Sequence, residues 1–398
     1  MSKKEKPLSG AISVWSNSYD SPTGYGQQVK LLVDRLVRDG AEVAMLSNFG
    51  LEGTINTIRT PYGKVKHYPR GMDLYSNDVA ANDHNHFSSN FPDLNDLFIS
   101  LYDVWVMKSK QYDKLRKIAA WTPLDHITTP PEVEEFLRKP NVVPIAMAPN
   151  GVRQLTKLGI ECEYVPHAID TKVMKPTELL SSGLDPKEMI GGKDKFIVGM
   201  VAANKANGMV HRKAFGENIM AFSIFQKKHP DAVLYIHSDP IGRAGGWNLP
   251  SLLSSLGIPD SAVCFPDPND YRFGLSHRDL AAFYTSFDVL LASSYGEGFG
   301  VPTMEAQACG TRVIGSGWAA TEDLVSEDGW LVDGTPTWNS GQNAWWQVPN
   351  VPSIVNALEL AYEKGKSRSQ ISIDFAQDYD VEKVWRDYWL PTITKLLV

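Results

Sequence analysis

The chain has 398 residues, a length that suits two domains of about 150–200 residues each. Its 43% hydrophobic and 21% charged residues are typical of a globular protein, and no run reaches the roughly 18 apolar residues that a membrane helix needs. The net charge of -7 excludes a general attraction to nucleic acid but leaves a local basic groove open. Because Cys162, Cys264 and Cys309 are far apart and lack metal-ligand spacing, we expect reduced thiols and a cytoplasmic protein.

The first 50 residues predict a strand, a helix and a second strand. Residues 11–15 and 42–46 are short apolar runs, and the segment between them has apolar residues at helical spacing, namely Val29, Leu32, Val33 and Leu36. This order predicts a parallel sheet. Gly24 and Gly26 precede the helix, and by themselves they are explained equally well by a plain tight turn.

Polar residues end several of the strands that we expect next, at residues 97–103, 119–126, 142–146 and 162–167. Ligands of parallel sheets bind at the carboxyl edge, where such residues gather. We therefore expect a cleft lined by Asp103, Asp125, His126 and His167. The alternative for each is a residue that only caps a strand end or a turn.

The segment Asp83-His84-Asn85-His86 raises the hypothesis of a metal site. A His-x-His pair in a loop is more often a hydrated turn, and the sequence places no cysteine or glutamate partner nearby. We therefore expect no metal here.

Five basic residues predict a basic helical face, Lys108, Lys110, Lys114, Arg116 and Lys117. Such a face is most simply a solvated surface. The alternative is a contact for an anionic acceptor, either a lipid headgroup or nucleic acid.

A second strand–helix–strand unit follows residues 171–195, whose proline, serine and glycine content is typical of a linker. Residues 196–202 predict its first strand. The next helix has core residues at helical spacing, Phe215, Ile219, Phe222 and Phe225. Lys205, Arg212 and Lys213 lie between strand and helix, where cations are unfavourable unless an anion joins them. The cluster therefore predicts a bound diphosphate.

Residues 294–306 combine a glycine loop with the start of a helix. They follow an apolar strand, and Pro302 suits the first helical turn, where unpaired N–H groups favour a phosphate. Glu297 and Glu305 would repel a phosphate, but each can accept two hydroxyl hydrogen bonds. The alternative is that Glu305 complements the helix dipole and Glu297 is solvated. Both acids around one glycine loop favour a nucleotide sugar, which has a pyrophosphate between a ribose and a sugar.

The segment from Glu297 to Glu305, followed by residues 306–314, resembles the signature of family 4 glycosyltransferases of the GT-B fold. Arg312 replaces the usual proline of that signature. The resemblance implies an α/β fold of two Rossmann-like doubly wound domains that face each other across a cleft. The first, acceptor-binding domain would comprise residues 1–172 and a returning helix at about 379–398. The donor-binding domain would comprise residues 173–378.

The resemblance also implies roles for individual residues. Lys213 matches a lysine that grips the donor diphosphate, and Arg212 or the earlier Asn204 and Lys205 would supply its partner. Glu305 would hold the ribose and Glu297 the transferred sugar. The donor-binding set is Gly24, Gly26, Lys205, Pro266, Gly298, Phe299, Gly300, Val301, Thr303 and Glu305. The catalytic set is Lys213, Arg212 and Glu297, together with Asp125 and His126, which are included because of their position at a strand end and not because of the resemblance.

The expected reaction is transfer of a sugar from a nucleotide-diphosphate sugar to a hydroxyl acceptor. The resemblance implies retention of anomeric configuration and no required metal or other cofactor. The acceptor stays open among a lipid, a small molecule, a glycan, a protein and a modified nucleic acid. Alternatives are a nucleotide-sugar epimerase or hydrolase of the same fold, and a non-catalytic nucleotide-sugar-binding protein. A dehydrogenase is disfavoured because neither glycine loop reads Gly-x-Gly-x-x-Gly with an acid about 20 residues later.

Residues 331–349 contain three tryptophans, Trp338, Trp345 and Trp346. We expect a loop folded over the core. Aromatic stacking on a sugar or a base is the alternative.

Overall fold

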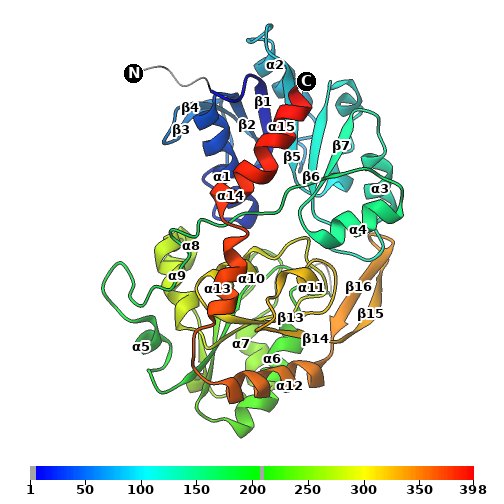
Figure 1. Ribbon diagram of the computed structural model, residues 1–398. Helices are drawn as coiled ribbons and strands as arrows, with labels where there is room; N and C mark the ends of the chain where they lie inside the picture. The colour runs from blue at the N-terminus through cyan, green and yellow to red at the C-terminus, as the bar shows by residue number, and fades with distance from the viewer. Residues whose placement is uncertain (1–5, 207–209) are drawn as a thin grey trace. The chain divides into compact units, whose positions relative to one another are not determined.

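The computed structural model describes residues 6–206 and 210–398, which form two compact units (Figure 1). Unit 1 comprises the described residues through Leu124, together with Thr128–Ala168 and Val381–Val398. Unit 2 comprises Asp125–Ile127 and Ile169–Asp380. The predicted domains instead placed residues 125–127 and 169–172 in the first domain. Residues 125–127 group with unit 2 because the backbone of Ile127 exchanges hydrogen bonds with that of Trp345, a residue of unit 2.

Unit 1 is built on a sheet with the strand order β3-β4-β2-β1-β5-β6-β7-β8. The strands are parallel except for β3, which runs antiparallel to β4. Their bounds are β1 (Ala11–Asn17), β2 (Glu42–Phe49), β3 (Asn56–Arg59), β4 (Lys64–Tyr68), β5 (Asp96–Leu101), β6 (Ile118–Thr122), β7 (Val142–Ala146) and β8 (Glu163–Tyr164). The predicted parallel sheet is thus present.

The α-helices of unit 1 are α1 (Gly24–Asp39), α2 (Ala80–Ser88), α3 (Pro131–Leu137), α4 (Pro149–Lys157), α14 (Val381–Val384) and α15 (Leu390–Leu397). A π-helical turn, Trp385–Trp389, joins α14 to α15. This last segment packs on unit 1 through Trp389, whose ring lies edge-on to Trp121 at 4.8 Å, and through Glu382, which pairs with Arg35 at 2.7 Å.

Helix α1 begins where the sequence places its glycines. The Thr23 hydroxyl accepts a hydrogen bond from the Gly26 amide and so caps the helix. A Cβ at Gly26 would collide with the backbone oxygen of Ser21, whereas a Cβ at Gly24 would meet open space. Gly26 is therefore required by packing, and Gly24 is not.

Two expectations for unit 1 are wrong. The polar segment 83–86 is not a loop but lies in α2, where His84 is buried and bonds to Ser13 and Asp96 at 3.0 and 2.7 Å. His86 instead contacts the Tyr68 hydroxyl at 2.8 Å, so the two histidines have separate protein partners.

The basic residues at 108–117 do not share one helical face. Two short 3₁₀ helices, η1 (Val104–Val106) and η2 (Lys110–Lys114), replace the expected α-helix. Lys108 pairs with Glu132, and Arg116 pairs with Asp96, so neighbouring acids separate these cations into different contacts.

Unit 2 contains a parallel sheet with the order β11-β10-β9-β12-β13-β14. Its strands are β9 (Phe196–Val201), β10 (Ala232–His237), β11 (Val263–Cys264), β12 (Val289–Ala292), β13 (Arg312–Ser316) and β14 (Trp330–Val332). The helices are α5 (Pro186–Ile190), α6 (Phe215–Lys228), α7 (Leu249–Ser255), η3 (Asp260–Ala262), α8 (Pro268–Phe273), α9 (His277–Ser286), α10 (Val301–Ala308), α11 (Thr321–Leu324), α12 (Val351–Lys364) and α13 (Gln370–Gln377).

The core of unit 2 follows the predicted pattern. Phe215, Ile219, Phe222 and Phe225 of α6 are fully buried, which confirms their prediction as core residues. Helix α6 packs on the sheet beside α12. This packing fixes the start of α6, and with it Arg212 and Lys213, which lie three and two residues before its first residue, Phe215.

Residues 334–349 form an antiparallel ribbon, not the expected loop. Strands β15 (Gly334–Asn339) and β16 (Ala344–Pro349) pair only with each other within their sheet (Figure 1). The intervening turn contains Asn343 with a φ of 50°, a left-handed conformation that asparagine tolerates.

Candidate functional site

The candidate site lies at the carboxyl edge of the unit 2 sheet. Strands β9 and β12 are neighbours and parallel, so the loops that follow them emerge at the same edge. The loop after β9 supplies Arg212 and Lys213, and the loop after β12 supplies Glu297. A hydrogen bond of 2.8 Å from the Tyr295 amide to the Arg212 carbonyl joins the two loops.

Three charged side chains meet there. Lys213 Nζ lies 2.6 Å from Glu297 Oε1, and Arg212 Nη1 lies 3.1 Å from Glu297 Oε2. Arg212 also donates to the carbonyl of Gly296 and lies 3.6 Å from Asp125 Oδ2. One carboxylate therefore links both predicted phosphate-binding cations.

The pKa values of these groups follow from burial and pairing. Burial lowers the pKa of Lys213, and the opposing effect of Glu297 does not fully cancel it. For Glu297, burial raises the pKa, but Lys213 and Arg212 outweigh burial and leave the pKa below its ordinary value. Glu297 is thus held as a carboxylate although only 14% of its side chain is exposed.

Asp125 and His126 form a second part of the cluster. Asp125 Oδ1 lies 2.7 Å from His126 Nδ1, and Asn339 Nδ2 lies 2.9 Å from His126 Nε2. The amide donates to Nε2, so Nδ1 carries the proton that Asp125 accepts. The His126 ring also stacks on Trp346, with centroids 4.7 Å apart and planes 16° apart.

Burial raises the pKa of Asp125, but the hydrogen bond with His126 and the charge of Arg212 bring it below its ordinary value. Asp125 thus joins the histidine to the cation cluster. The structure brings together all five residues of the predicted catalytic set, Lys213, Arg212, Glu297, Asp125 and His126.

The glycine loop has two positions that require glycine. A Cβ at Gly296 would collide with the backbone oxygen of Asp125. Gly300 caps α10 with a φ of 90°, where a side chain is strained. Pro302 lies in the first turn of α10, and the Thr303 amide donates to the Gly300 carbonyl at 3.0 Å. The predicted strand, glycine loop and helix N-terminus are therefore present.

Glu305 lies inside α10 and is 5% exposed. Its Oε2 accepts a hydrogen bond of 2.8 Å from the hydroxyl of Tyr284, on helix α9. Burial raises the pKa of Glu305 to about 7, although the bond from Tyr284 opposes this. Glu305 was predicted to accept hydrogen bonds from hydroxyl groups. Its raised pKa means that it holds a proton at higher pH than Glu297 does.

The earlier residues of the β9 loop do not join the cations. Asn204 is buried and has a structural role, since its Nδ2 donates to the carbonyls of Asp239 and Trp247 at 2.8 and 2.7 Å. His211 Nε2 and the Trp247 amide contact the Asn204 Oδ1 at 2.9 Å each. Lys205 is exposed beside it. Arg212 is therefore the cation that shares the Glu297 carboxylate with Lys213.

The remaining predicted donor-binding residues lie in different places. Pro266 lines a cavity of about 90 Å³ with the aromatic residues Tyr235 and Phe283. Phe299 is buried, with its ring 5.7 Å from that of Tyr379. Gly298 and Thr303 are buried and Val301 half-buried around the start of α10, and Gly24 and Gly26 begin α1 in unit 1.

Two other predicted cleft residues lie in unit 1. His167 is buried edge-on to Trp121 at 4.5 Å, and burial lowers its pKa to about 3, so it is a neutral core residue. Asp103 precedes η1. Among the described residues, no group of three or more His, Cys, Asp or Glu side chains has the arrangement of a metal site.

Sequence reasoning missed Tyr284 and Asn339, and it did not give Trp346 its contact with His126. Tyr284 lies 21 positions before Glu305, and Asn339 lies 213 positions after His126. The signal that would have located Asn339 is the Ser-Gly-Gln-Asn turn after it, which indicates a hairpin.

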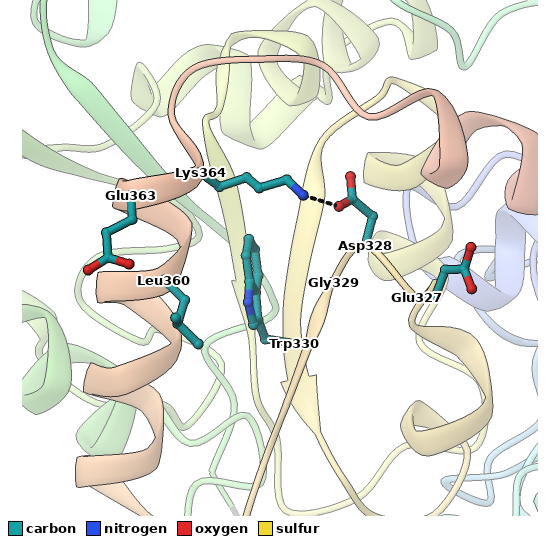
Figure 2. Close-up of a pocket in the computed structure, with 7 residues that line it drawn as sticks. All are labelled: Glu327, Asp328, Gly329, Trp330, Leu360, Glu363 and Lys364. Atoms are coloured by element: carbon teal, nitrogen blue, oxygen red, sulfur yellow. Dashed lines mark ion pairs between the residues drawn. The ribbon is translucent and has the colours of Figure 1, made fainter.

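A separate cavity of about 400 Å³ lies where β14 begins and α12 ends (Figure 2). Lys364 reaches from α12 to Asp328 at 2.9 Å, beside Trp330 and Leu360. Arg312, which stands where the resemblance has proline, also pairs with Asp328 at 2.8 Å. Arg312 thus forms an ion pair with a residue that lines this cavity, and none of the predicted site residues lines it.

Part of the chain is similar in sequence to known glycosyltransferases. Residues 209–338 match the family described as glycosyl transferases group 1. The D-inositol 3-phosphate glycosyltransferase of Mycobacterium sp. (strain KMS) is 31% identical over 156 residues, which are 38% of this chain and 30% of that protein. The one from Salinispora arenicola is 40% identical over 91 residues, 22% of this chain and 18% of that protein. The chain therefore spans less than a third of the length of these relatives.

Solved structures match nearly the whole chain. Sucrose-phosphate synthase from Thermosynechococcus elongatus has a TM-score of 0.67 at 15% identity, over 97% of this chain and 98% of that one. The α,α-trehalose-phosphate synthase from Burkholderia vietnamiensis has a TM-score of 0.68 at 11% identity, over 97% and 99%. These likenesses confirm the fold class, α/β with two Rossmann-like units. None of the described helices is both long and apolar enough to span a membrane.

Proposed function

We propose that this protein is a retaining, metal-independent glycosyltransferase that moves a sugar from a nucleotide-diphosphate sugar to a hydroxyl acceptor. The observation that carries the proposal is the meeting of Arg212, Lys213 and Glu297 beside the N-terminus of α10. All three lie within the segment that matches group 1 glycosyltransferases. Retention and independence from metal rest on the resemblance of the Glu297–Glu305 motif alone.

The cations would stabilise the leaving group. When the anomeric C–O bond breaks, negative charge gathers on the pyrophosphate, and hydrogen-bond donors already aimed at it lower the barrier. Lys213 and Arg212 are such donors, because ion pairs and a main-chain bond hold both heads in place. Each donor of this kind is typically worth about 10²–10³ in rate. The amides at the start of α10 would add their dipoles.

Donor binding would change the partner of Glu297. A pyrophosphate between Lys213 and Arg212 competes with the carboxylate that now holds them 2.6 and 3.1 Å away. A carboxylate displaced from the cations can accept hydroxyl bonds from the transferred sugar. Glu305 would hold the ribose with Oε1, since Oε2 accepts the Tyr284 bond.

Asp125 and His126 would position the cluster. Asp125 accepts from His126 and lies 3.6 Å from Arg212 Nη1, the same nitrogen that pairs with Glu297, so it would help to restrain the guanidinium. Loss of this restraint would disorder Arg212 at the moment when it must meet the leaving phosphate.

A thermal-shift panel of nucleoside diphosphates and nucleotide sugars tests the proposal. A ligand at about 100 times its Kd stabilises the native state by about 2.7 kcal/mol. We expect one nucleoside diphosphate class to raise the melting temperature, and Lys213→Ala and Glu305→Ala each to reduce the rise. Lys228→Ala is the matched control, because Lys228 lies on α6 with 63% of its side chain exposed.

The control should respond like the wild type. A panel with no stabilising nucleotide, or equal shifts in all three variants, would refute the assigned site. Incubation of the donor without acceptor then separates the alternatives, because rapid and complete turnover favours a hydrolase or epimerase. Product stereochemistry by NMR and activity in a chelator test retention and independence from metal.

A further inference from the structure

The ribbon of β15 and β16 presents two indole rings to solvent. Trp338 and Trp345 are directly opposite each other in the antiparallel register. Their ring centroids are 5.0 Å apart and their planes meet at 69°. The two residues are 49% and 42% exposed, which is high for residues of this size and hydrophobicity.

The two faces of the ribbon do different things. Alternate residues of a strand point to opposite faces. Asn339 and Trp346 share one face, and both contact His126 of the candidate site. Trp338 and Trp345 share the other face. Trp338 and Trp345 therefore lie on the ribbon face opposite to the one that contacts His126.

The ribbon is fixed in unit 2 by main-chain bonds. The Trp345 amide and carbonyl both bond to Ile127, at 3.0 and 2.9 Å. The Gln347 amide donates to the Tyr295 carbonyl in the glycine loop at 2.9 Å. Because Trp345 uses its backbone groups on Ile127, it forms a non-hydrogen-bonded pair with Trp338, the kind in which side chains lie closest. The indoles are therefore held rigidly relative to Glu297 and His126.

The chemistry of the ribbon selects a neutral partner. Residues 334–349 contain no Asp, Glu, Lys or Arg, and their polar groups are hydroxyls and amides. A nucleic-acid strand or an anionic membrane would need cations beside the aromatic rings. Sugars instead offer apolar C–H faces that pack on an indole, and hydroxyls that bond to amides and hydroxyls.

We propose that the Trp338–Trp345 face is a binding subsite for a neutral oligosaccharide. The subsite is separate from the donor site of the proposed function, because the register places the two indoles on the ribbon face opposite to Asn339 and Trp346. The bound oligosaccharide extends over more than one sugar unit, because the two indoles are neighbours.

The test measures binding of three neutral tetrasaccharides, maltotetraose, cellotetraose and α-1,2-mannotetraose, by calorimetry and tryptophan fluorescence. We expect at least one to bind, and Trp338→Ala and Trp345→Ala each to weaken its binding by about tenfold, as truncation of a stacking tryptophan does. Tyr62→Ala is the control, since Tyr62 is an aromatic residue of similar exposure, 52%, in unit 1. Circular dichroism of each variant verifies folding.

Three outcomes would overturn the proposal. None of the tetrasaccharides binds at concentrations up to about 10 mM. Alternatively, folded tryptophan variants bind as tightly as wild type. Finally, the substitutions change the oligomeric state without any sugar binding, which would show that a second copy of the chain covers this face. Nucleoside diphosphate binding is measured in parallel, so that its absence refutes the proposed function, whereas its presence without sugar binding refutes only the subsite.

Discussion

The pKa of Glu305 is raised whereas that of Glu297 is lowered. This difference leads to a prediction for how the stability of Glu305→Gln depends on pH. Burial raises the pKa of Glu305 from 4.5 to about 7, so the folded protein holds this proton more tightly than the unfolded chain does. Stability therefore falls as the pH rises from 4.5 to about 7, and the full cost is present above that range. At about 1.4 kcal/mol per pH unit, the cost is about 3 kcal/mol.

Glutamine removes the ionisation but keeps an oxygen that can accept the Tyr284 bond. The amide can also change stability by an amount that does not depend on pH. We therefore subtract the free energy of unfolding of the wild type from that of the variant at each pH, and follow how this difference changes with pH. We expect this difference to move in favour of Glu305→Gln by about 3 kcal/mol between about pH 4.5 and pH 8.

The assay is urea unfolding at several pH values, followed by circular dichroism. Hydrogen exchange of amides in β12 and β13 assigns the transition of unit 2, because a chain of two units need not unfold in one step. Glu322→Gln is the matched control, since Glu322 is exposed and a surface change should matter little. A difference for Glu305→Gln that stays flat with pH would refute the argument that burial controls this carboxyl group.

Three further predictions concern unit 2, one of them with a reference substitution in unit 1. Asn204→Ala should lower stability by about 2 kcal/mol or more in urea unfolding, because it leaves two backbone carbonyls without their donor. Gly300→Ala should cost about 1–2 kcal/mol in melting experiments through its positive φ, whereas Gly24→Ala, which meets open space at the start of α1, should cost much less. Lys213→Met should raise the pKa of Glu297, measured by carbon-13 NMR of the carboxyl group, because Lys213 is the strongest influence that lowers it. An unchanged carboxyl titration would contradict the ion pair.

The sequence predicts the centre of the site well because parallel strands deliver their loops to one edge. That rule alone brings Lys213 and Glu297 together, although 84 positions separate them. The buried spacing of α6 likewise fixes where its N-terminus must lie.

The same reasoning fails where polar residues are stabilised by distant partners. Helix α2 lacks a side-chain cap and contains polar residues, so its sequence predicts a loop. The contacts of His84 with Ser13 and Asp96, which stabilise the helix, cannot be seen in the local sequence. The prediction for residues 334–349 is wrong for another reason. Three tryptophans favoured a loop folded over the core, but the segment pairs as two strands whose alternating faces place two of the tryptophans in solvent.

The roles of Glu297 and Glu305 diverge through their surroundings and not through their chemistry. The two are the same residue type, eight positions apart in one motif, and no local pattern distinguishes their protonation. Cations on the neighbouring loop lower the pKa of Glu297, whereas burial raises that of Glu305 despite the opposing hydrogen bond from Tyr284. Groups whose environments push their pKa values apart can serve as separate acceptor and proton-carrying sites. An ionised Glu297 beside Lys213 and a Glu305 that titrates near 7 would therefore respond differently to the same donor, the first by changing partners and the second by releasing a proton to accept ribose hydroxyls.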